Sequence, residues 1–243
     1  MTPPLFLVPD LEDGDTIVLT GAEAYHAATV KRLAVGEPAL LADGHGGLAE
    51  VQVSRVGPDR VVFQVRSRRL LERPEPRLVV VQALPKGERA ELAVELLTEL
   101  GVDEIVPWAA DRAISQWKGD RAAKGVAKWQ RVAQAAAKQS RRAWIPAISA
   151  LAGSAEVAGR ISAARLALLL YSGADQPLTQ TAVPAVGEVV LVVGPEGGLS
   201  PAELALFGEH GGRPVRLGAE VLRTSTAGAA ALAVLSATAG RWG

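Results

Sequence analysis

The sequence contains no cysteine, only three histidines, and no long apolar run. Without cysteine there are no disulfides, no thiolate metal ligands and no cysteine nucleophile. The histidines are scattered at positions 26, 45 and 210, so we expect no metal site. The longest apolar run, LALLLY at 166–171, falls far below the roughly 18 to 20 residues of a membrane span. The first residues also lack the basic region of a secretory signal, and we expect a cytoplasmic protein without a membrane contact.

The net charge is zero, with 26 basic and 26 acidic residues, so the whole molecule has no strong attraction to polyanions. Local charge differs from this average. Residues 111–144, the basic segment, carry nine Lys or Arg against two Asp, a net charge of +7. This segment is a candidate surface for a polyanion such as RNA.

The chain divides by its hydrophobic pattern near residue 73. Before that point short strands alternate with turns, and LAEVQVS after the turn DGHGG (43–47) has the period of two that predicts a β-hairpin. We therefore expect residues 1–73 to form a small β-barrel. The Arg-, Glu- and Pro-rich stretch 66–77 has the composition of a linker.

After the linker, apolar strands alternate with helices. Strands are predicted at RLVVVQAL, VDEIVPW, RLALLLY and EVVLVV, with a short one at PVRL, and helices near 88–101, 121–142, 201 onward and 226 onward. Strands that are apolar on both faces and separated by helices indicate a mostly parallel sheet. Residues 74–243 are therefore expected to form an α/β domain.

The segment VVGPEGGLSPAE (192–203) joins one predicted strand to one predicted helix. It lacks the Lys-Ser/Thr of a phosphate-binding Walker loop and the glycine spacing of a dinucleotide fingerprint. Ser200 as N-cap, Pro201 at the first helical position and Glu203 two residues later form a predicted capping box. Gly194, Gly197 and Gly198 then form a turn at the carboxyl end of a strand, where a ligand can approach the backbone closely.

A second turn, in VRLGAEVLRTSTAG (215–228), repeats this arrangement with Gly218 and Arg223 ahead of the last helix. Thr224 and Thr226 are interpreted first as caps of that helix. Two such turns on neighbouring strands can form one pocket. From these residues alone, a nucleotide or sugar phosphate site of a metabolic enzyme stays open.

The motifs GPEGGLSPAE and LGAEVLRTSTA resemble those of the SPOUT superfamily, specifically its RsmE-type 16S ribosomal RNA uridine-N3 methyltransferase family. The similarity extends to LPKGERAELAVELLTELGVDEIVPW, to AKWQRVAQAAAKQSRRAWIP and to YHAATVKRLAVGEPALLADG, and so covers nearly the whole chain. Glu220 stands where many members have Arg, and Ser225 where many have Glu.

The resemblance implies a SPOUT domain with a deep trefoil knot at 74–243 and a PUA-like, RNA-binding barrel at 1–73. It also implies a homodimer and S-adenosylmethionine as cofactor, with 16S ribosomal RNA or the small ribosomal subunit as substrate. The implied cofactor-binding residues lie in the two turns: Gly194, Pro195, Glu196, Gly197, Gly198, Leu217, Gly218, Val221, Leu222 and Thr224.

Methylation of uracil N3 requires loss of a weakly acidic proton. A cation near O2 or O4 stabilises the resulting charge, and we assign this catalytic role to Arg223, with a phosphate-binding or structural role as the alternative. Glu196 either accepts the proton or, as we favour, fixes its own loop. N3 lies on the Watson–Crick edge, so the target base must be unpaired or flipped out.

Eight residues are predicted to contact RNA, by their position or by the family similarity. For Lys86 and Arg89 a solvated turn is an equal alternative, and for His26 a packing role is favoured. Trp117, Trp129 and Trp144 are interpreted as core or dimer contacts rather than base-stacking platforms. The predicted RNA-binding residues are Lys86, Arg89, Lys128, Arg131, Gln139, Arg142, His26 and Arg32. A non-catalytic RNA-binding protein that keeps the SPOUT fold is the main competing hypothesis.

Overall fold

The computed structural model describes residues 2–11 and 13–242. The chain forms two compact units. The first contains Met1–Arg73 and Ala137–Ile145, and the second contains Pro74–Ala136 and Pro146–Gly243. The nine-residue return to the first unit is explained by packing, because Ala143 and Ile145 join an apolar cluster with Leu5, Leu7 and Leu48.

The first unit is built on a five-stranded sheet in the order β1-β3-β4-β5-β2. β1 pairs in parallel with β3, and the other pairs are antiparallel, including the predicted β3–β4 hairpin around DGHGG. Phe6, Leu41 and Phe63 are fully buried in its core. The elements are β1 (Leu5–Leu7), β2 (Thr16–Thr20), α1 (Gly21–Tyr25), a π-helical turn (His26–Val30), β3 (Pro38–Ala42), β4 (Gly47–Val56) and β5 (Arg60–Leu70).

The predicted linker at 66–77 is wrong over its first five residues, because β5 continues to Leu70. The backbone of residues 67–70 pairs with Gly47–Glu50 of β4, while the side chains of Arg66, Arg68 and Arg69 remain exposed. Charged composition therefore marked an exposed strand end and not a break in the strand. Only residues 71–76 lie outside strands here.

The second unit is built on a six-stranded sheet in the order β11-β9-β10-β6-β7-β8, in which every pair is parallel. The predicted mostly parallel α/β fold is thereby confirmed. Val79, Val80 and Val81 are fully buried, as expected for a strand covered on both faces. The strands are β6 (Arg77–Ala83), β7 (Glu104–Trp108), β8 (Ala147–Ile148), β9 (Leu166–Leu170), β10 (Glu188–Val193) and β11 (Arg213–Val215).

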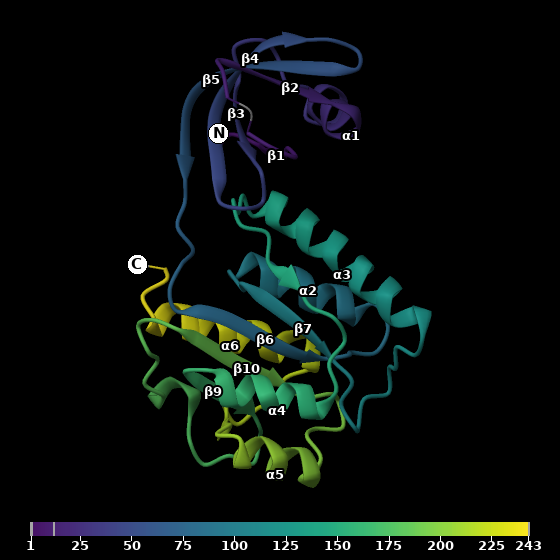
Figure 1. The fold of residues 1–243 in the computed structure, drawn as a ribbon, viewed down its shortest axis with the longest axis vertical. Coiled ribbons are helices and arrows are strands. Elements are labelled where there is room, and N and C mark those ends of the chain that lie inside the picture. Colours follow the sequence, from purple (N-terminus) through teal and green to yellow (C-terminus); the bar gives the residue numbers. More distant parts are fainter. Residues whose placement is uncertain (1, 12, 243) are drawn as a thin grey trace. The chain divides into compact units, whose positions relative to one another are not determined.

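Helices cover both faces of this sheet (Figure 1). The helices are α2 (Arg89–Glu99), α3 (Asp120–Gln139), α4 (Ser154–Ala163), α5 (Pro201–Glu209) and α6 (Thr224–Thr238), with a 3-10 turn at Leu178–Gln180. α2, α3 and α6 pack on one face through residues such as Leu97, Trp129 and Leu232. α4 and α5 pack on the other through Val157 and Phe207. The basic helix is shorter than the predicted 121–142, because Arg141 adopts a positive φ of 60°.

An ionic network joins the amino ends of three neighbouring strands. Arg77, which begins β6, bonds both Glu104 of β7 and Glu188 of β10, and Arg160 of α4 lies 2.7 Å from Glu104. Burial by itself raises the pKa of Glu104, but hydrogen bonds from Ser149, Arg160 and Arg77 outweigh it and hold the pKa below its usual value. The network stabilises the sheet at the amino ends of these strands, opposite to the carboxyl ends where the candidate site lies.

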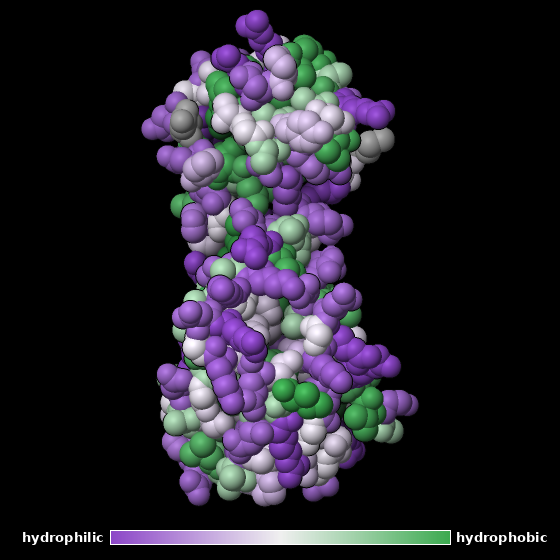
Figure 2. Space-filling model, turned by 90° about the vertical axis from the view of Figure 1, so that its right-hand side faces the viewer, coloured by the Kyte–Doolittle hydropathy of each residue, from purple (hydrophilic) through white to green (hydrophobic). Residues whose placement is uncertain are grey.

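The described residues contain no helix long and apolar enough to cross a bilayer. In the same part of the chain, no three His, Cys, Asp or Glu side chains form a group able to hold a metal ion. In Figure 2 the visible face of the second unit is mostly hydrophilic, with scattered hydrophobic residues.

Candidate functional site

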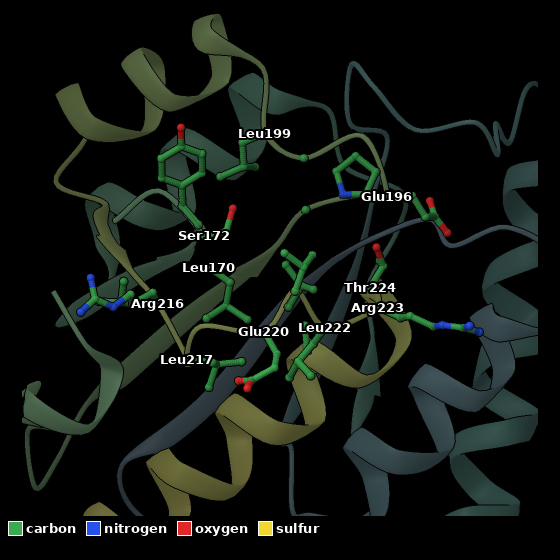
Figure 3. Close-up of a pocket in the computed structure, with 18 of the residues that line it drawn as sticks. Leu170, Ser172, Glu196, Leu199, Arg216, Leu217, Glu220, Leu222, Arg223 and Thr224 are labelled. Carbon is green, nitrogen blue, oxygen red and sulfur yellow. The ribbon is translucent and has the colours of Figure 1, made fainter. Parts of the chain in front are cut away.

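A cavity of about 500 Å³ opens at the carboxyl ends of β9, β10 and β11. These three strands are neighbours in the sheet, so the loops that leave them meet at one edge. The lining residues come from three chain segments: 170–172, 193–199 and 215–227. Figure 3 shows Leu170 from the first of these segments, and Leu217 and Leu222 from the last. The pocket is therefore lined partly by apolar side chains, partly by backbone and partly by charged side chains such as Glu220 and Arg223.

The first wall is the turn after β10, which we call the pocket loop (Gly194–Leu199). Gly198 has a φ of +71°, a conformation that L side chains rarely adopt. A Cβ at Gly194 would lie 3.4 Å from the amide nitrogen of Leu199, which shows how tightly the turn closes. The predicted capping box follows it: Ser200 Oγ accepts from Glu203 N at 3.1 Å, and Ser200 N donates to Glu203 Oε2 at 2.7 Å.

The second wall is the stretch from β11 to the start of α6. The cavity is lined by every residue that the sequence predicted for cofactor binding, and by Arg223. The structure thus brings the two turns together on one pocket. Residues 217–223, between β11 and α6, form no helix or strand, so their backbone groups are open to a ligand.

The third wall, Leu170, Tyr171 and Ser172, was missed from the sequence. It follows β9, whose neighbours β10 and β11 carry the other two walls. Its signal was present, because YSG directly follows the apolar strand LALLL, but no motif distinguished it from an ordinary turn. A Cβ on Gly173 would lie 2.8 Å from the Tyr171 ring, so glycine here leaves room for that ring.

Arg223 is the N-cap residue of α6, is exposed and lines the pocket. In Figure 3 its side chain extends away from Leu217 and Leu222. The expected capping role of Thr224 and Thr226 is wrong: no side chain caps α6, Thr224 is its first helical residue, and Thr226 Oγ1 donates to Arg223 O at 3.2 Å. The helix begins two residues earlier than the predicted start at residue 226.

Two positions depart from the family pattern. Glu220 is exposed and lines the pocket. Ser225 is buried in the first turn of α6, where it does not line the cavity. A carboxylate therefore occupies the pocket wall at 220, and no ionisable side chain stands at 225.

Four of the predicted RNA-binding residues lie in the second unit. Lys86 and Arg89 are exposed, after β6 and at the start of α2. Lys128 and Arg131 lie on α3, where Lys128 Nζ is 2.5 Å from Glu91 Oε1 of α2. Arg131 is exposed, and among the described residues its side chain has no ion pair. The two α3 cations are thus not equally available to an anionic partner.

The other four lie in the first unit. Arg32, with a φ of 54°, and Gln139 are exposed, and Arg142 is half-buried. His26 packs edge-on against Phe6, with ring centroids 6.0 Å apart. Burial, followed by the nearby Lys138, lowers the pKa of His26, although Glu23 opposes this. The favoured packing role of His26 agrees with this environment.

The tryptophans have distinct environments. Trp129 is buried in the core of the second unit and stacks edge-on with Trp117 at 5.2 Å. Trp144, in the first unit, donates from Nε1 to Leu71 O at 3.1 Å and lies beneath the Arg73 guanidinium. The core interpretation is therefore confirmed for Trp129, and the Trp144 indole nitrogen is already satisfied within the protein.

The described pocket falls within a recognised domain. Residues 72–236 match the family model described as an RNA methyltransferase domain. The matched range contains all six strands of the parallel sheet and both glycine turns.

Full-length relatives narrow the class. The ribosomal RNA small subunit methyltransferase E of Mycobacterium tuberculosis is 42% identical over 98% of this chain and 93% of its own length. The crystal structure of the same-named protein from Neisseria gonorrhoeae, bound to S-adenosyl methionine, superposes with a TM-score of 0.84 at 27% identity, covering 97% of this chain and 98% of that one. A putative methyltransferase from Legionella pneumophila in complex with the same cofactor gives 0.83 at 28% identity, covering 98% of each chain. The chain belongs to the ribosomal RNA small subunit methyltransferase E family.

Proposed function

We propose that this protein transfers the methyl group of S-adenosylmethionine to N3 of a uridine in 16S ribosomal RNA. The observation that carries the proposal is that both glycine turns, predicted separately from the sequence, line one cavity at the carboxyl edge of the parallel sheet. The family relatives whose structures contain S-adenosylmethionine support the choice of cofactor.

The residues present fit this cofactor. A cavity of about 500 Å³ suits a ligand of nucleoside size. Leu170, Leu217 and Leu222 offer apolar contacts for adenine, while the backbone of the pocket loop and of residues 217–222 offers hydrogen bonds to its edge and to ribose. Gly198 supplies the left-handed conformation of the turn, and glycine at 194 permits the close approach to Leu199 that shapes these backbone groups.

The bound cofactor supplies an electrophilic methyl group, and the protein supplies orientation and charge. The two walls hold the ligand, and in-line positioning provides much of the rate enhancement. Arg223 stabilises the negative charge that develops on uracil O4 or O2 as the weakly acidic N3 proton is lost to water. Glu196 accepts a hydrogen bond from the backbone of Lys86 and thereby fixes the pocket loop, as its 3.2 Å contact supports.

The substrate requires a larger surface than the pocket. We assign RNA contacts to exposed cations of the second unit, led by Arg131, and to the PUA-like first unit. A homodimer is supported by the apolar side chains that line the pocket mouth yet face solvent, Val221 at 84% and Leu222 at 41% exposure. From the family resemblance we also propose a trefoil knot in the second unit and a cytoplasmic location.

Two measurements test the proposal. Calorimetry with S-adenosylmethionine and S-adenosylhomocysteine should give saturable binding of one ligand per chain; absence of binding favours the non-catalytic RNA-binding alternative, and tighter binding of ATP favours a nucleotide enzyme. Mass spectrometry of ribosomal RNA from a deletion strain should show loss of one 3-methyluridine, restored by the wild-type gene. An unchanged modification profile would overturn the assigned reaction.

A further inference from the structure

The outer side of the pocket loop is held by a segment that does not line the pocket. Residues 109–115 follow β7 and reach the pocket loop after β10. Arg112 Nη1 donates to Gly197 O at 3.2 Å and to Leu199 O at 3.4 Å. One guanidinium thus bonds two carbonyls of the same turn, from the side away from the cavity.

The neighbouring residue, Asp111, completes the attachment. Ser200 Oγ donates to Asp111 Oδ2 at 2.8 Å, and Asp111 N donates to Glu203 Oε1 at 2.7 Å. Glu203 is only 2% exposed, and its other oxygen accepts from Ser200 N. The two residues of the α5 capping box therefore also form hydrogen bonds with the segment after β7.

Backbone contact at Gly197 shows how closely the two segments meet. A Cβ at Gly197 would lie 3.0 Å from Arg112 Cβ and 3.3 Å from Arg112 O. This close approach is the reason that residue 197 must be glycine. Its φ does not require glycine, because it is not in the left-handed region that Gly198 occupies. The glycine motif thus serves the segment after β7 as well as the pocket.

We propose that Arg112 and Asp111 are positioning residues for the cofactor. Arg112 fixes two carbonyls of the pocket loop outward and Asp111 holds the start of α5 that follows the loop, so that the opposite side of the loop faces the cavity in its binding conformation. The inference rests on the proposed function, because it assumes that the loop binds S-adenosylmethionine. A loop that is ordered before binding loses less conformational entropy when the ligand binds. Neither residue touches the reacting atoms.

The experiment measures the Kd of S-adenosylmethionine and S-adenosylhomocysteine by calorimetry for wild type and for Arg112→Ala, Arg112→Lys and Asp111→Ala. Arg112→Ala should raise both Kd values by about five- to tenfold, within the range of one ordinary hydrogen bond. Arg112→Lys should fall between wild type and alanine, because its ammonium keeps the charge and the N–H donors on a shorter side chain. Asp111→Ala should weaken binding in the same direction.

Arg165→Ala is the matched control, because Arg165 is exposed in the same unit and directly precedes β9, at the edge opposite to the pocket. It should leave both Kd values unchanged. Thermal unfolding separates positioning from folding: Arg112→Ala should keep the wild-type Tm within about 2 °C, since exposed substitutions are nearly neutral. Wild-type affinity in Arg112→Ala overturns this inference and leaves the proposed function intact, whereas failure of wild type to bind overturns the proposed function itself.

Discussion

The backbone N–H of Lys86 donates a hydrogen bond to Glu196 Oε1 across 3.2 Å. The two residues follow β6 and β10, which are neighbours in the parallel sheet. The contact gives the Glu196 carboxylate a role as a hydrogen-bond acceptor between two loops. It favours the loop-fixing interpretation of Glu196 over that of a proton acceptor.

Substitution of Glu196 distinguishes these two roles. Glu196→Gln keeps an oxygen that can accept from Lys86 N, so methyl transfer should stay within about threefold of wild type, whereas Glu196→Ala should raise the Kd of S-adenosylmethionine by about fivefold, one modest hydrogen bond. Calorimetry and a methyl-transfer assay on ribosomal RNA check both values. A large loss of turnover in Glu196→Gln, with unchanged cofactor affinity, would instead identify Glu196 as the base.

Arg223→Ala should lower the methyl-transfer rate by about 100-fold or more, because removal of one preorganised donor at a developing oxyanion costs that much. Its Kd for S-adenosylmethionine should stay within about threefold, since the side chain extends away from Leu217 and Leu222. Arg213→Ala is the control, an exposed Arg at the start of β11. Retained turnover in Arg223→Ala removes this residue from the mechanism.

Arg131 should contribute more to RNA binding than Lys128. A phosphate that approaches Lys128 competes with Glu91 at 2.5 Å, whereas Arg131 has no such competitor among the described residues. Arg131→Ala should therefore weaken binding of ribosomal RNA more than Lys128→Ala, and should lower the slope of log K against log salt by about one. Filter binding over a salt series measures both. Equal losses in the two variants would contradict the assigned difference.

Glu104 should make stability depend on acid pH. Its pKa is lowered in the folded state, so its contribution is complete above the ordinary value of 4.5 and is lost as the pH falls through the folded pKa. Glu104→Gln should destabilise the protein at pH 7 by about 2 to 3 kcal/mol, because Arg77 and Arg160 lose a buried partner. Urea unfolding from pH 7 to 3 should show the difference from wild type narrowing below pH 4.5. Exposed Glu95→Gln should show no such trend.

The sequence predicted the elements that have strong local signals. Apolar strands such as EVVLVV and the capping box at Ser200 appear as expected, because burial and capping are encoded within a few residues. Strand order is different, since β10 lies between β9 and β6, and three other strands separate β6 from β10 in the chain. For that reason neither Tyr171 nor Arg112 was predicted as a site residue. Tyr171 lines the pocket and Arg112 lies behind the pocket loop, and both positions depend on the order of the strands in the sheet.

The basic segment shows a second limit. Its charge predicts a polyanion surface, but charge alone does not show that Lys128 is paired with Glu91 or that Trp129 is in the core. Partners 37 residues apart are set by the packing of α2 against α3 and carry no local sequence pattern. A composition argument therefore identifies the segment, and only the structure ranks its residues.

The first unit is discontinuous in the chain, because it includes Ala137–Ile145 as well as Met1–Arg73. A gene fragment cut at residue 73 would encode the sheet but omit Ala143 and Ile145, leaving Leu5, Leu7 and Leu48 without part of their apolar cover. Recombination that exchanges amino-terminal halves between relatives would likewise separate Ala143 and Ile145 from the leucines that they cover. A chimaera that exchanges the first unit of this protein therefore needs two grafts, one for each of its chain segments.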